Sequence, residues 1–287
     1  MALATSPAGA DPVLPSGGAV VAGVASIGPA AGGTLIVDQV SARAVIDWQR
    51  FSIGAGGLVQ VNNGAGATLN RVLSGDPSSI MGRLAATGSV WLVNPAGVIV
   101  GPSGQVTTGG DFVASTRMIG VEPFMAGGSL VAEGAGGRVA NAGSIATGGD
   151  TVLIGAMVEN SGGISAGGHA ALLAAGRVVL REAAGDSRIH IEHVSGAAGD
   201  VSTSGRIEAA AAELRAVSGN VYALAADTSG VVRATAADLS GGRIRLVAGQ
   251  DVHVSGTLDA SGSAGGRVDI TAGERVILAD GAQLAAR

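Results

Sequence analysis

The segment Gly241-Gly242-Arg243-Ile244-Arg245-Leu246-Val247-Ala248-Gly249 recurs without a gap as Gly265-Gly266-Arg267-Val268-Asp269-Ile270-Thr271-Ala272-Gly273. Within the first copy, apolar side chains alternate with charged ones, as expected for a strand whose successive residues point to opposite faces. Glycines at both ends of each copy indicate turns. Each copy therefore predicts a short β-strand with one buried face.

A second repeat lies earlier in the chain, where Gly143-Ser144-Ile145 returns as Gly163-Ile164. The whole pattern is an irregular repeat of about 19 to 26 residues. A unit this short cannot bury its apolar face alone, whereas stacked units pair their backbones and share one continuous core. The sequence therefore predicts an all-β fold, a parallel β-helix (solenoid). About a dozen coils would make it about 55 to 60 Å long at the usual strand spacing.

The amino-acid composition excludes two other classes of chain. The 50 glycines among 287 residues show no strict period of three and come with only 8 prolines, which excludes a collagen-like helix. A hydrophobic content of 47% and a mean hydropathy of +0.44 exclude disorder. Aromatic residues make up only 2%, so the core consists of small and branched side chains, as a narrow interior requires.

Charge and cysteine content narrow the choice of partners and compartments. The basic residues number 17 against 22 acidic ones and form no basic block, so no nucleic-acid partner is expected. The absence of cysteine excludes disulfides and thiolate zinc sites, and it suits a chain that crosses an oxidising compartment. The first basic residue is Arg43, so Met1 does not begin a signal peptide, and we expect a mature exported segment.

The two ends of the solenoid require different explanations. An open end of a β-helix is an unpaired edge that promotes aggregation. Residues 1–40 contain alternating apolar stretches and are therefore expected to form an N-terminal β cap. Irregular β-helix repeats fill residues 131–287, and the last repeat stops without a cap at Arg287. We therefore expect the natural protein to be longer than this chain, which forms one continuous domain over residues 1–287.

A string of unlike residues replaces the plain repeat between residues 34 and 119. Its parts are Gln39-Val40-Ser41-Ala42-Arg43-Ala44-Val45-Ile46-Asp47-Trp48-Gln49-Arg50-Phe51-Ser52-Ile53-Gly54, Leu69-Asn70-Arg71-Val72, Ile80-Met81-Gly82-Arg83-Leu84, Gly88-Ser89-Val90-Trp91-Leu92-Val93-Asn94-Pro95-Ala96-Gly97-Val98-Ile99-Val100-Gly101 and Gly109-Gly110-Asp111-Phe112-Val113-Ala114-Ser115-Thr116. This string resembles the two-partner secretion (TPS) domain, or haemagglutination activity domain, at the N-terminus of filamentous-haemagglutinin-like exoproteins.

The resemblance implies both a fold and a function. The fold is a right-handed parallel β-helix. The function is that of the N-terminal secretion module of a large Gram-negative exoprotein, an adhesin-like virulence factor that reaches the cell surface or the medium through the periplasm. Its partner would be an outer-membrane β-barrel transporter whose POTRA domains recognise the module. The module would then nucleate β-helix folding outside the cell, as a monomer.

The resemblance also implies a site. The Asn-Pro-Asn-Gly signature of the family corresponds to Asn94, Pro95, Ala96 and Gly97, with alanine in the third position. Asn94 is pushed out of the α region by Pro95, and Gly97 can take a positive φ, so the residues themselves predict a tight turn. Whether Asn94 serves as a turn former or as a direct transporter contact is open at this stage, and both roles can hold together.

Six further residues belong to the candidate site. Asn70 and Arg71 lie in an apolar setting, where buried polar groups need hydrogen bonds, so they predict a polar network that braces the cap or a secretion motif. The expected cap and core residues are Gln39, Trp48, Phe51 and Trp91. For the aromatic residues, packing in the core is favoured over an exposed docking surface.

The sequence does not indicate an enzyme active site or a metal site. A β-helix lyase needs clustered carboxylates for acid and base catalysis, whereas Asp38, Asp47, Asp76 and Asp111 are well separated in sequence. In His190-Ile191-Glu192-His193, alternate residues face opposite sides of a strand, so at most two could bind one metal ion. We expect no enzyme activity, metal, cofactor or small-molecule substrate. The alternative to a secretion module is a β-helical adhesin that binds host or cell-surface ligands directly.

Overall fold

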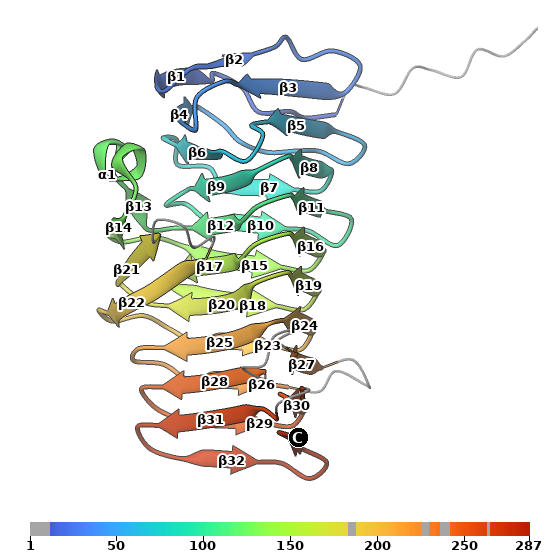
Figure 1. Ribbon diagram of the computed structural model, residues 1–287, viewed down its shortest axis with the longest axis vertical. Helices are drawn as coiled ribbons and strands as arrows, with labels where there is room; N and C mark the ends of the chain where they lie inside the picture. Colours follow the sequence, from blue (N-terminus) through green and yellow to red (C-terminus); the bar gives the residue numbers. More distant parts are fainter. Residues whose placement is uncertain (1–11, 183–187, 225–229, 236–241, 263–264) are drawn as a thin grey trace, which may run out of the picture.

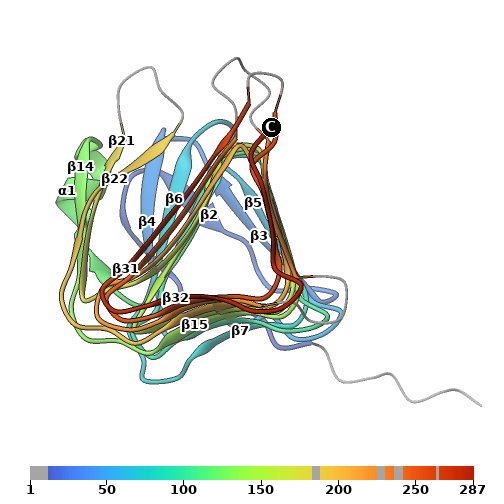
Figure 2. The same ribbon diagram turned by 90° about the horizontal axis from the view of Figure 1, so that it is seen from below.

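Three long sheets form the walls of a rod with a triangular cross-section in the computed structural model (Figures 1 and 2). The model describes residues 12–182, 188–224, 230–235, 242–262 and 265–287. Within each sheet, strands that follow one another in space belong to successive coils, and nearly all of these neighbours pair in parallel. The predicted all-β fold and the parallel β-helix are confirmed.

The three walls of the rod are called sheets I, II and III. Sheet I contains β1 (Ala19–Ala22), β4 (Arg43–Trp48), β6 (Ala67–Val72), β9 (Ser89–Val93), β12 (Phe112–Ser115), β17 (Thr151–Gly155), β20 (His169–Ala174), β25 (Ala211–Ala216), β28 (Arg243–Ala248) and β31 (Arg267–Ala272). Sheet II contains β7 (Ser78–Ile80), β10 (Val98–Val100), β15 (Arg138–Asn141), β18 (Met157–Asn160), β23 (Val201–Thr203), β26 (Val221–Ala223), β29 (Val252–Val254) and β32 (Val276–Leu278). Sheet III contains β2 (Ala25–Ile27), β3 (Thr34–Gln39), β5 (Leu58–Asn62), β8 (Arg83–Ala86), β11 (Gln105–Thr108), β16 (Ser144–Thr147), β19 (Gly163–Ala166), β24 (Arg206–Ala209), β27 (Val231–Ala234), β30 (Thr257–Asp259) and β33 (Gln283–Ala285).

A small antiparallel sheet and a short helix lie outside the rod, against sheet I (Figure 2). This outer sheet contains β13 (Met118–Ile119), β14 (Ser129–Glu133), β21 (Arg177–Glu182) and β22 (Ile189–Ser195), in that order. The helix is α1 (Val121–Ala126). At the N-terminal end of the rod, β1 and β2 run antiparallel to β4 and β3. Residues 1–11 of the predicted cap lie outside the described residues.

The strand register reproduces the repeats that the sequence shows. Arg243 pairs with Arg267, and Ser144 pairs with Gly163, so each of these strands lies beside its own repeat in the next coil. Three steps along sheet I are longer, from Phe112 in β12 to its partner Thr151 in β17, from β20 to β25, and from Ala211 in β25 to Arg243 in β28. The expected repeat length of about 19 to 26 residues is therefore wrong for these coils, and the first two of them also contain α1 and the outer-sheet strands.

Two separate apolar cores result from this arrangement. The first fills the rod with side chains from all three walls, such as Trp48, Leu92 and Leu246. The second lies between the outer face of sheet I and the outer sheet with α1, and it includes Trp91 and Phe124. In its middle section sheet I is therefore buried on both faces, which the sequence analysis did not predict.

Candidate functional site

Asn94 begins the turn between β9 and β10, and its side chain is fully buried. Its Nδ2 atom donates to the Asp76 carbonyl oxygen at 2.9 Å and to Ser78 Oγ at 3.0 Å, both of them in the segment that leads into β7. Its Oδ1 atom accepts from the Ala96 N–H at 3.0 Å. The amide thus satisfies its hydrogen-bonding groups inside the folded chain, so it cannot face a partner while the protein is folded.

Gly97 closes the same turn with a φ of +138°, a conformation that disfavours other residues. Its N–H donates to the Asn94 carbonyl oxygen at 3.0 Å, and the Pro95 carbonyl oxygen accepts from the Gly137 N–H of the following coil at 2.7 Å. A Cβ atom at this position would lie 3.3 Å from the Arg138 carbonyl oxygen. The turn is therefore held between the coils before and after it.

Asn70 faces the interior of the rod. Its Oδ1 atom accepts from Trp48 Nε1 at 2.9 Å. Trp48 in turn packs edge-to-face on Phe51, with ring centroids 5.5 Å apart. All three side chains are buried. The indole N–H and the amide therefore satisfy each other in an otherwise apolar interior, which removes the cost of burying either one alone.

Arg71 points to the other side of the same strand. Its Nε and Nη2 atoms pair with the two carboxylate oxygens of Asp47 at 2.7 and 2.8 Å, a bidentate ion pair between neighbouring coils. The predicted internal polar network therefore includes Asn70 but not Arg71, because adjacent strand residues face opposite sides. The structure places Asn70 inside the rod and Arg71 outside it.

A polar ladder lies at the corner between sheets III and I. Thr68 Oγ1 donates to Gln39 Oε1 at 2.6 Å and accepts from Asn63 Nδ2 at 3.0 Å. Asn63 also donates to the Ser89 carbonyl oxygen at 2.9 Å and accepts from the Gly88 N–H at 2.7 Å. These bonds join three successive coils. Gln39 was a predicted cap residue, whereas Asn63 was not among the predicted site residues, although an Asn-Gly pair after an alternating strand is a turn signal.

Trp91 is the centre of the second core. Its ring meets that of Phe124 in α1 edge-to-face, with centroids 5.6 Å apart, and its Nε1 atom has no hydrogen-bond partner within the described residues. Arg43 Nη1 donates to the Phe124 carbonyl oxygen at 3.0 Å, and its Nη2 pairs with Glu182 at 2.6 Å. Arg43 therefore fastens both α1 and the end of β21 to sheet I.

Arg117 is a second buried link to the outer sheet. It is 3% exposed, and its Nε and Nη1 atoms donate to the carbonyl oxygens of Ala175 at 2.6 Å and Gly134 at 2.7 Å. Burial lowers the pKa of this guanidinium. The two backbone acceptors belong to segments far apart in the chain, so Arg117 fixes the start of β21 next to the end of β14.

Asp111 lies at a corner where the Gly-Gly-Asp sequence occurs in two coils. Its Oδ1 atom accepts from the Asp150 N–H at 2.7 Å, and Asp150 in turn accepts from the N–H groups of His169 and Ile189. Burial raises the pKa of Asp111 to about 6, and the nearby carboxylates of Asp150 and Glu182 add to this, against the hydrogen bonds of Asp150 and Ser89. The carboxylates thus cap the backbone of successive coils.

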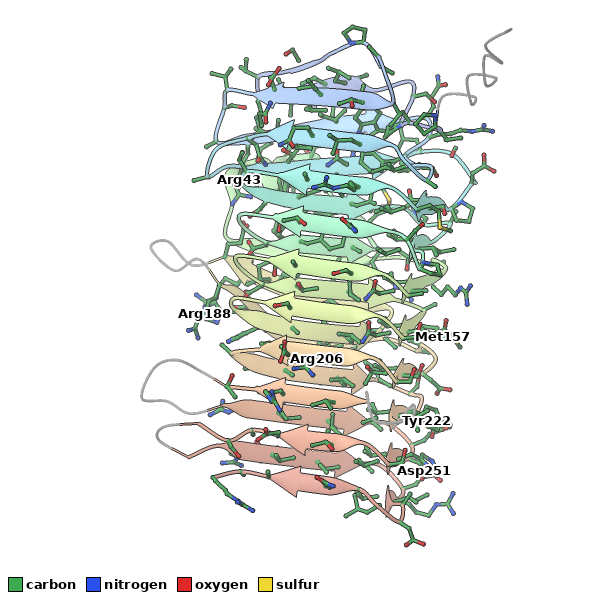
Figure 3. All side chains as sticks on the ribbon, turned by 90° about the vertical axis from the view of Figure 1, so that its right-hand side faces the viewer. Arg43, Met157, Arg188, Arg206, Tyr222 and Asp251 are labelled. Atoms are coloured by element: carbon green, nitrogen blue, oxygen red, sulfur yellow. The ribbon has the colours of Figure 1, made fainter. Side chains whose placement is uncertain are left out.

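A groove lies along this corner, and glycines from several coils are among the residues that line it. Arg43 and Arg188, which line it, lie on the same side of the rod (Figure 3). Within the described residues, no group of three histidine, aspartate or glutamate side chains could hold a metal ion. His190 and Glu192 lie on β22, where Glu192 pairs with Arg181. Within the same residues, no helix is long and apolar enough to cross a membrane.

Comparison with known proteins places this arrangement among secretion domains. A family model described as TPS secretion domain matches residues 12–270. The heme/hemopexin-binding protein of Haemophilus influenzae is 35% identical over 104 residues, which are 36% of this chain and 11% of that protein. A second protein of that name, also from H. influenzae, is 33% identical over 108 residues, 37% of this chain and 12% of the relative. The chain thus spans about a tenth of the length of these relatives.

Two solved structures share the fold. The crystal structure of the HMW1 secretion domain from Haemophilus influenzae has a TM-score of 0.67 and 26% identity, over 95% of this chain and 84% of that one. The crystal structure of a filamentous hemagglutinin secretion domain has a TM-score of 0.57 and 16% identity, over 93% of this chain and 99% of that one. The second likeness is one of fold alone.

Proposed function

The chain belongs to the TPS secretion domain family, and on this premise we propose that it is recognised by the POTRA domains of a cognate outer-membrane β-barrel transporter. Proteins with this domain are secreted Gram-negative exoproteins that have such a transporter as their partner. We also propose how the transporter recognises the chain, that the chain nucleates folding at the cell surface, and that it is a monomer. The family match over residues 12–270 is the observation that carries it.

The pairing pattern supports a role in nucleation. Each parallel pair along sheet I joins segments that lie a whole coil apart in the chain, as Leu172 does with Leu153 before it and Leu214 after it. A coil therefore gains its hydrogen bonds only after the previous coil is in place. The coils that contain the family motif have the polar ladder and the large aromatic side chains of both cores. We therefore propose that the coils of the family motif are the first to form.

The burial of Asn94 supports an indirect role for the motif. Its amide is used by Asp76, Ser78 and Ala96, so we propose that it acts by forming the turn early in folding. Recognition by POTRA domains then precedes folding, with an extended N-terminal segment adding to a POTRA sheet edge through main-chain hydrogen bonds. Residues 1–40 are proposed as the cap that later closes the rod.

Export from a Gram-negative host tests the proposal. The chain is fused to a signal peptide and expressed with and without the partner transporter, as wild type, as Asn94→Ala and as Asn62→Ala. Asn62 is exposed and serves as the matched control. Wild type and Asn62→Ala are expected in the medium only when the transporter is present, and Asn94→Ala in strongly reduced amounts. Export without the transporter, or none with it, would contradict the secretion role.

A second measurement separates folding from recognition. Denatured wild type and Asn94→Ala are compared for binding to isolated POTRA domains and for their refolding rates in solution. Equal binding together with slower refolding of Asn94→Ala supports the turn-forming role. Weaker binding with an unchanged refolding rate would instead assign Asn94 to direct contact with the transporter.

A further inference from the structure

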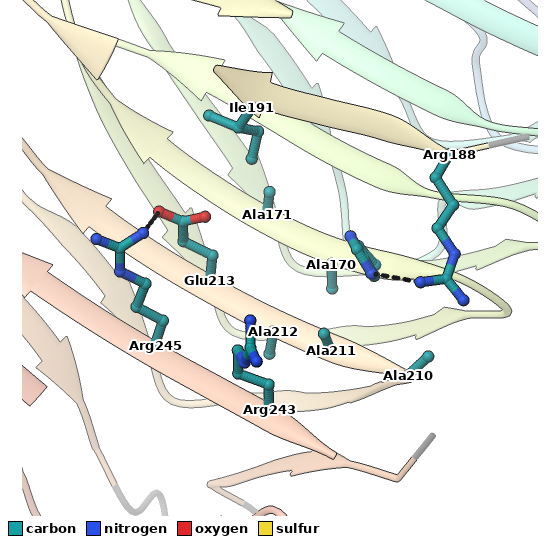
Figure 4. Close-up of a pocket in the computed structure, with 11 residues that line it drawn as sticks. Ala170, Ala171, Arg188, Ile191, Ala210, Ala211, Ala212, Glu213, Arg243 and Arg245 are labelled. Atoms are coloured by element: carbon teal, nitrogen blue, oxygen red, sulfur yellow. Dashed lines mark hydrogen bonds and ion pairs between the residues drawn. The ribbon is translucent and has the colours of Figure 1, made fainter. Parts of the chain in front are cut away.

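A pocket of about 350 Å³ lies on the outer face of sheet I, where the outer sheet stops covering it (Figure 4). The strand register explains its shape. Ala211 pairs with His169 on one side and with Arg243 on the other, and Glu213 pairs with Ala171 and Arg245 in the same way. Methyl groups therefore form the floor, and long charged side chains stand around it.

The charged groups of the pocket are incompletely matched with one another. The Arg243 side chain is exposed, and its guanidinium has no hydrogen bond or ion pair to any other residue that the structure describes. Glu213 Oε1 is buried and accepts no hydrogen bond within that part of the chain, although Arg245 Nη1 lies 3.8 Å away. Arg188 Nη1 lies 3.4 Å from His169 Nε2. Arg215 Nη1 lies 3.9 Å from the same Glu213 oxygen, so two guanidinium groups stand near this carboxylate without a hydrogen bond to Oε1, while the Arg243 guanidinium at the pocket is unpaired within the described residues.

We propose that this pocket binds a hydroxylated carboxylate of the acidic-sugar class. The ligand carboxylate pairs with Arg243 in the planar, two-point manner that guanidinium groups favour. A ligand hydroxyl donates to the exposed part of the Glu213 carboxylate, whose side chain is 20% exposed and lines the pocket. The apolar face of the sugar ring lies on the alanine floor, and the volume matches small-ligand sites. This role is separate from secretion and was not expected from the sequence.

Binding of D-glucuronate to the 287-residue chain, followed by calorimetry and NMR, tests the proposal. Glucose offers the hydroxyls without the charge, and cyclohexanecarboxylate offers the charge without the hydroxyls. Glucuronate is expected to bind at least about tenfold more tightly than either, since it alone satisfies both groups. Equal binding of glucuronate and cyclohexanecarboxylate, or no saturable binding of glucuronate, would overturn the proposal.

Two variants and a control assign the contacts. Arg243→Gln is expected to weaken glucuronate binding at least about tenfold. Glu213→Gln is expected to reduce the preference for glucuronate over cyclohexanecarboxylate. Arg267→Gln removes the same charge one coil further along the same column of sheet I, outside the pocket, and is expected to leave binding unchanged. An equal loss of glucuronate binding in Arg267→Gln would show that Arg243 acts only by attracting anions in general.

The source of the ligand follows from one further comparison. Methyl glucuronide represents a sugar residue within or at the end of a glycan, since its anomeric oxygen is substituted. Binding as tight as that of the free acid assigns the pocket to a glycan. Binding of the free acid alone assigns it to a soluble sugar acid. Neither result depends on the transporter, so the outcome is independent of the proposed secretion role.

Discussion

Single polar residues at the corners of the rod hold neighbouring coils together. Asn63, Asn94 and Asp111 each accept from a backbone N–H and are each buried. A corner exposes backbone groups that no sheet can pair, so a short polar side chain that accepts from a backbone N–H is the simplest way to satisfy them. These residues are therefore expected to contribute more to stability than their small size suggests.

Asn63→Ala tests this at one corner. The variant leaves the Gly88 N–H and the Ser89 carbonyl oxygen without their partner, so we expect a loss of about 2 to 4 kcal/mol of unfolding free energy. The neighbouring Asn62→Ala removes only exposed hydrogen bonds and is expected to cost less than about 0.5 kcal/mol. Urea denaturation of both variants measures the difference, and similar losses would contradict the role of the ladder.

Asp111 predicts a dependence of stability on pH. Its pKa is about 6 in the folded protein against 3.8 as the ordinary value, so the folded state holds the proton more tightly. The stabilisation is complete below pH 3.8 and is lost as the pH rises through 6, by up to about 3 kcal/mol. Asp111→Asn keeps an acceptor for the Asp150 N–H and cannot ionise. We therefore expect the wild type to lose stability relative to this variant between pH 4 and pH 7, as urea midpoints would show. If the urea midpoints of the two proteins changed in parallel with pH, the predicted role of Asp111 would be refuted.

At the scale of the elements, the distance between coils decides which residues the turns accept. A Cβ atom at Gly162 would lie 2.1 Å from the Gly143 carbonyl oxygen of the previous coil, whereas at Gly163 it would meet nothing within 4 Å. Two adjacent glycines therefore have different reasons to be present. The first allows close stacking of the coils, and the second occupies a position that has room for a side chain.

Alanine substitution at the two positions should separate these roles. Gly162→Ala forces the coils apart or distorts the turn and is expected to cost about 1 to 3 kcal/mol. Gly163→Ala is expected to be neutral or to stabilise the protein by about 0.4 to 1 kcal/mol, since it restricts the unfolded chain. Thermal denaturation compares them, and equal effects would show that coil spacing does not limit the turn.

The sequence predicted some elements well and others poorly, for physical reasons. Strands with one buried face, such as β28, alternate visibly, so the repeat and the fold could be inferred from local pattern alone. The outer sheet could not, because β14 pairs with β21, and the strands from β15 to β20 lie between them in the chain. Its signal was the uninterrupted apolar runs in sheet I, such as Val90 to Val93 and Ala170 to Ala174, which indicate strands buried on both faces. Asn70 and Arg71 were expected in one polar network although strand alternation puts them on opposite faces, and their partners on other coils could not be inferred from local pattern.

At the scale of the whole molecule, the last coil of this chain has fewer buried contacts than the middle coils. The middle coils have an interior core, an outer core and corner ladders, whereas the last coil leaves Val276, Leu278 and Leu284 exposed. Local opening is cheapest where buried contacts are fewest. Stability should therefore decline from the coils of the family motif toward β33.

Amide hydrogen exchange resolved along the chain measures this decline. We expect the slowest exchange in β6, β9 and β12, whose strands are buried on both faces, and the fastest within the three walls in β31, β32 and β33. The expected order reflects both packing and pairing, because β6, β9 and β12 pair with a strand on each side, whereas β31, β32 and β33 each end a sheet. Uniform protection along the rod would indicate a single cooperative unit and contradict the proposed nucleus.

The outer sheet also has a mechanical consequence. A rod of stacked coils pulled from its ends should lengthen one coil at a time, since each coil is bonded only to its neighbours. β14 and β21, however, pair along their lengths although β15 to β20 lie between them in the chain. Those intervening coils cannot extend under load until this pair separates. In a force spectrum the separation of β14 from β21 should therefore give one high rupture peak, followed by the sudden extension of the coils between them.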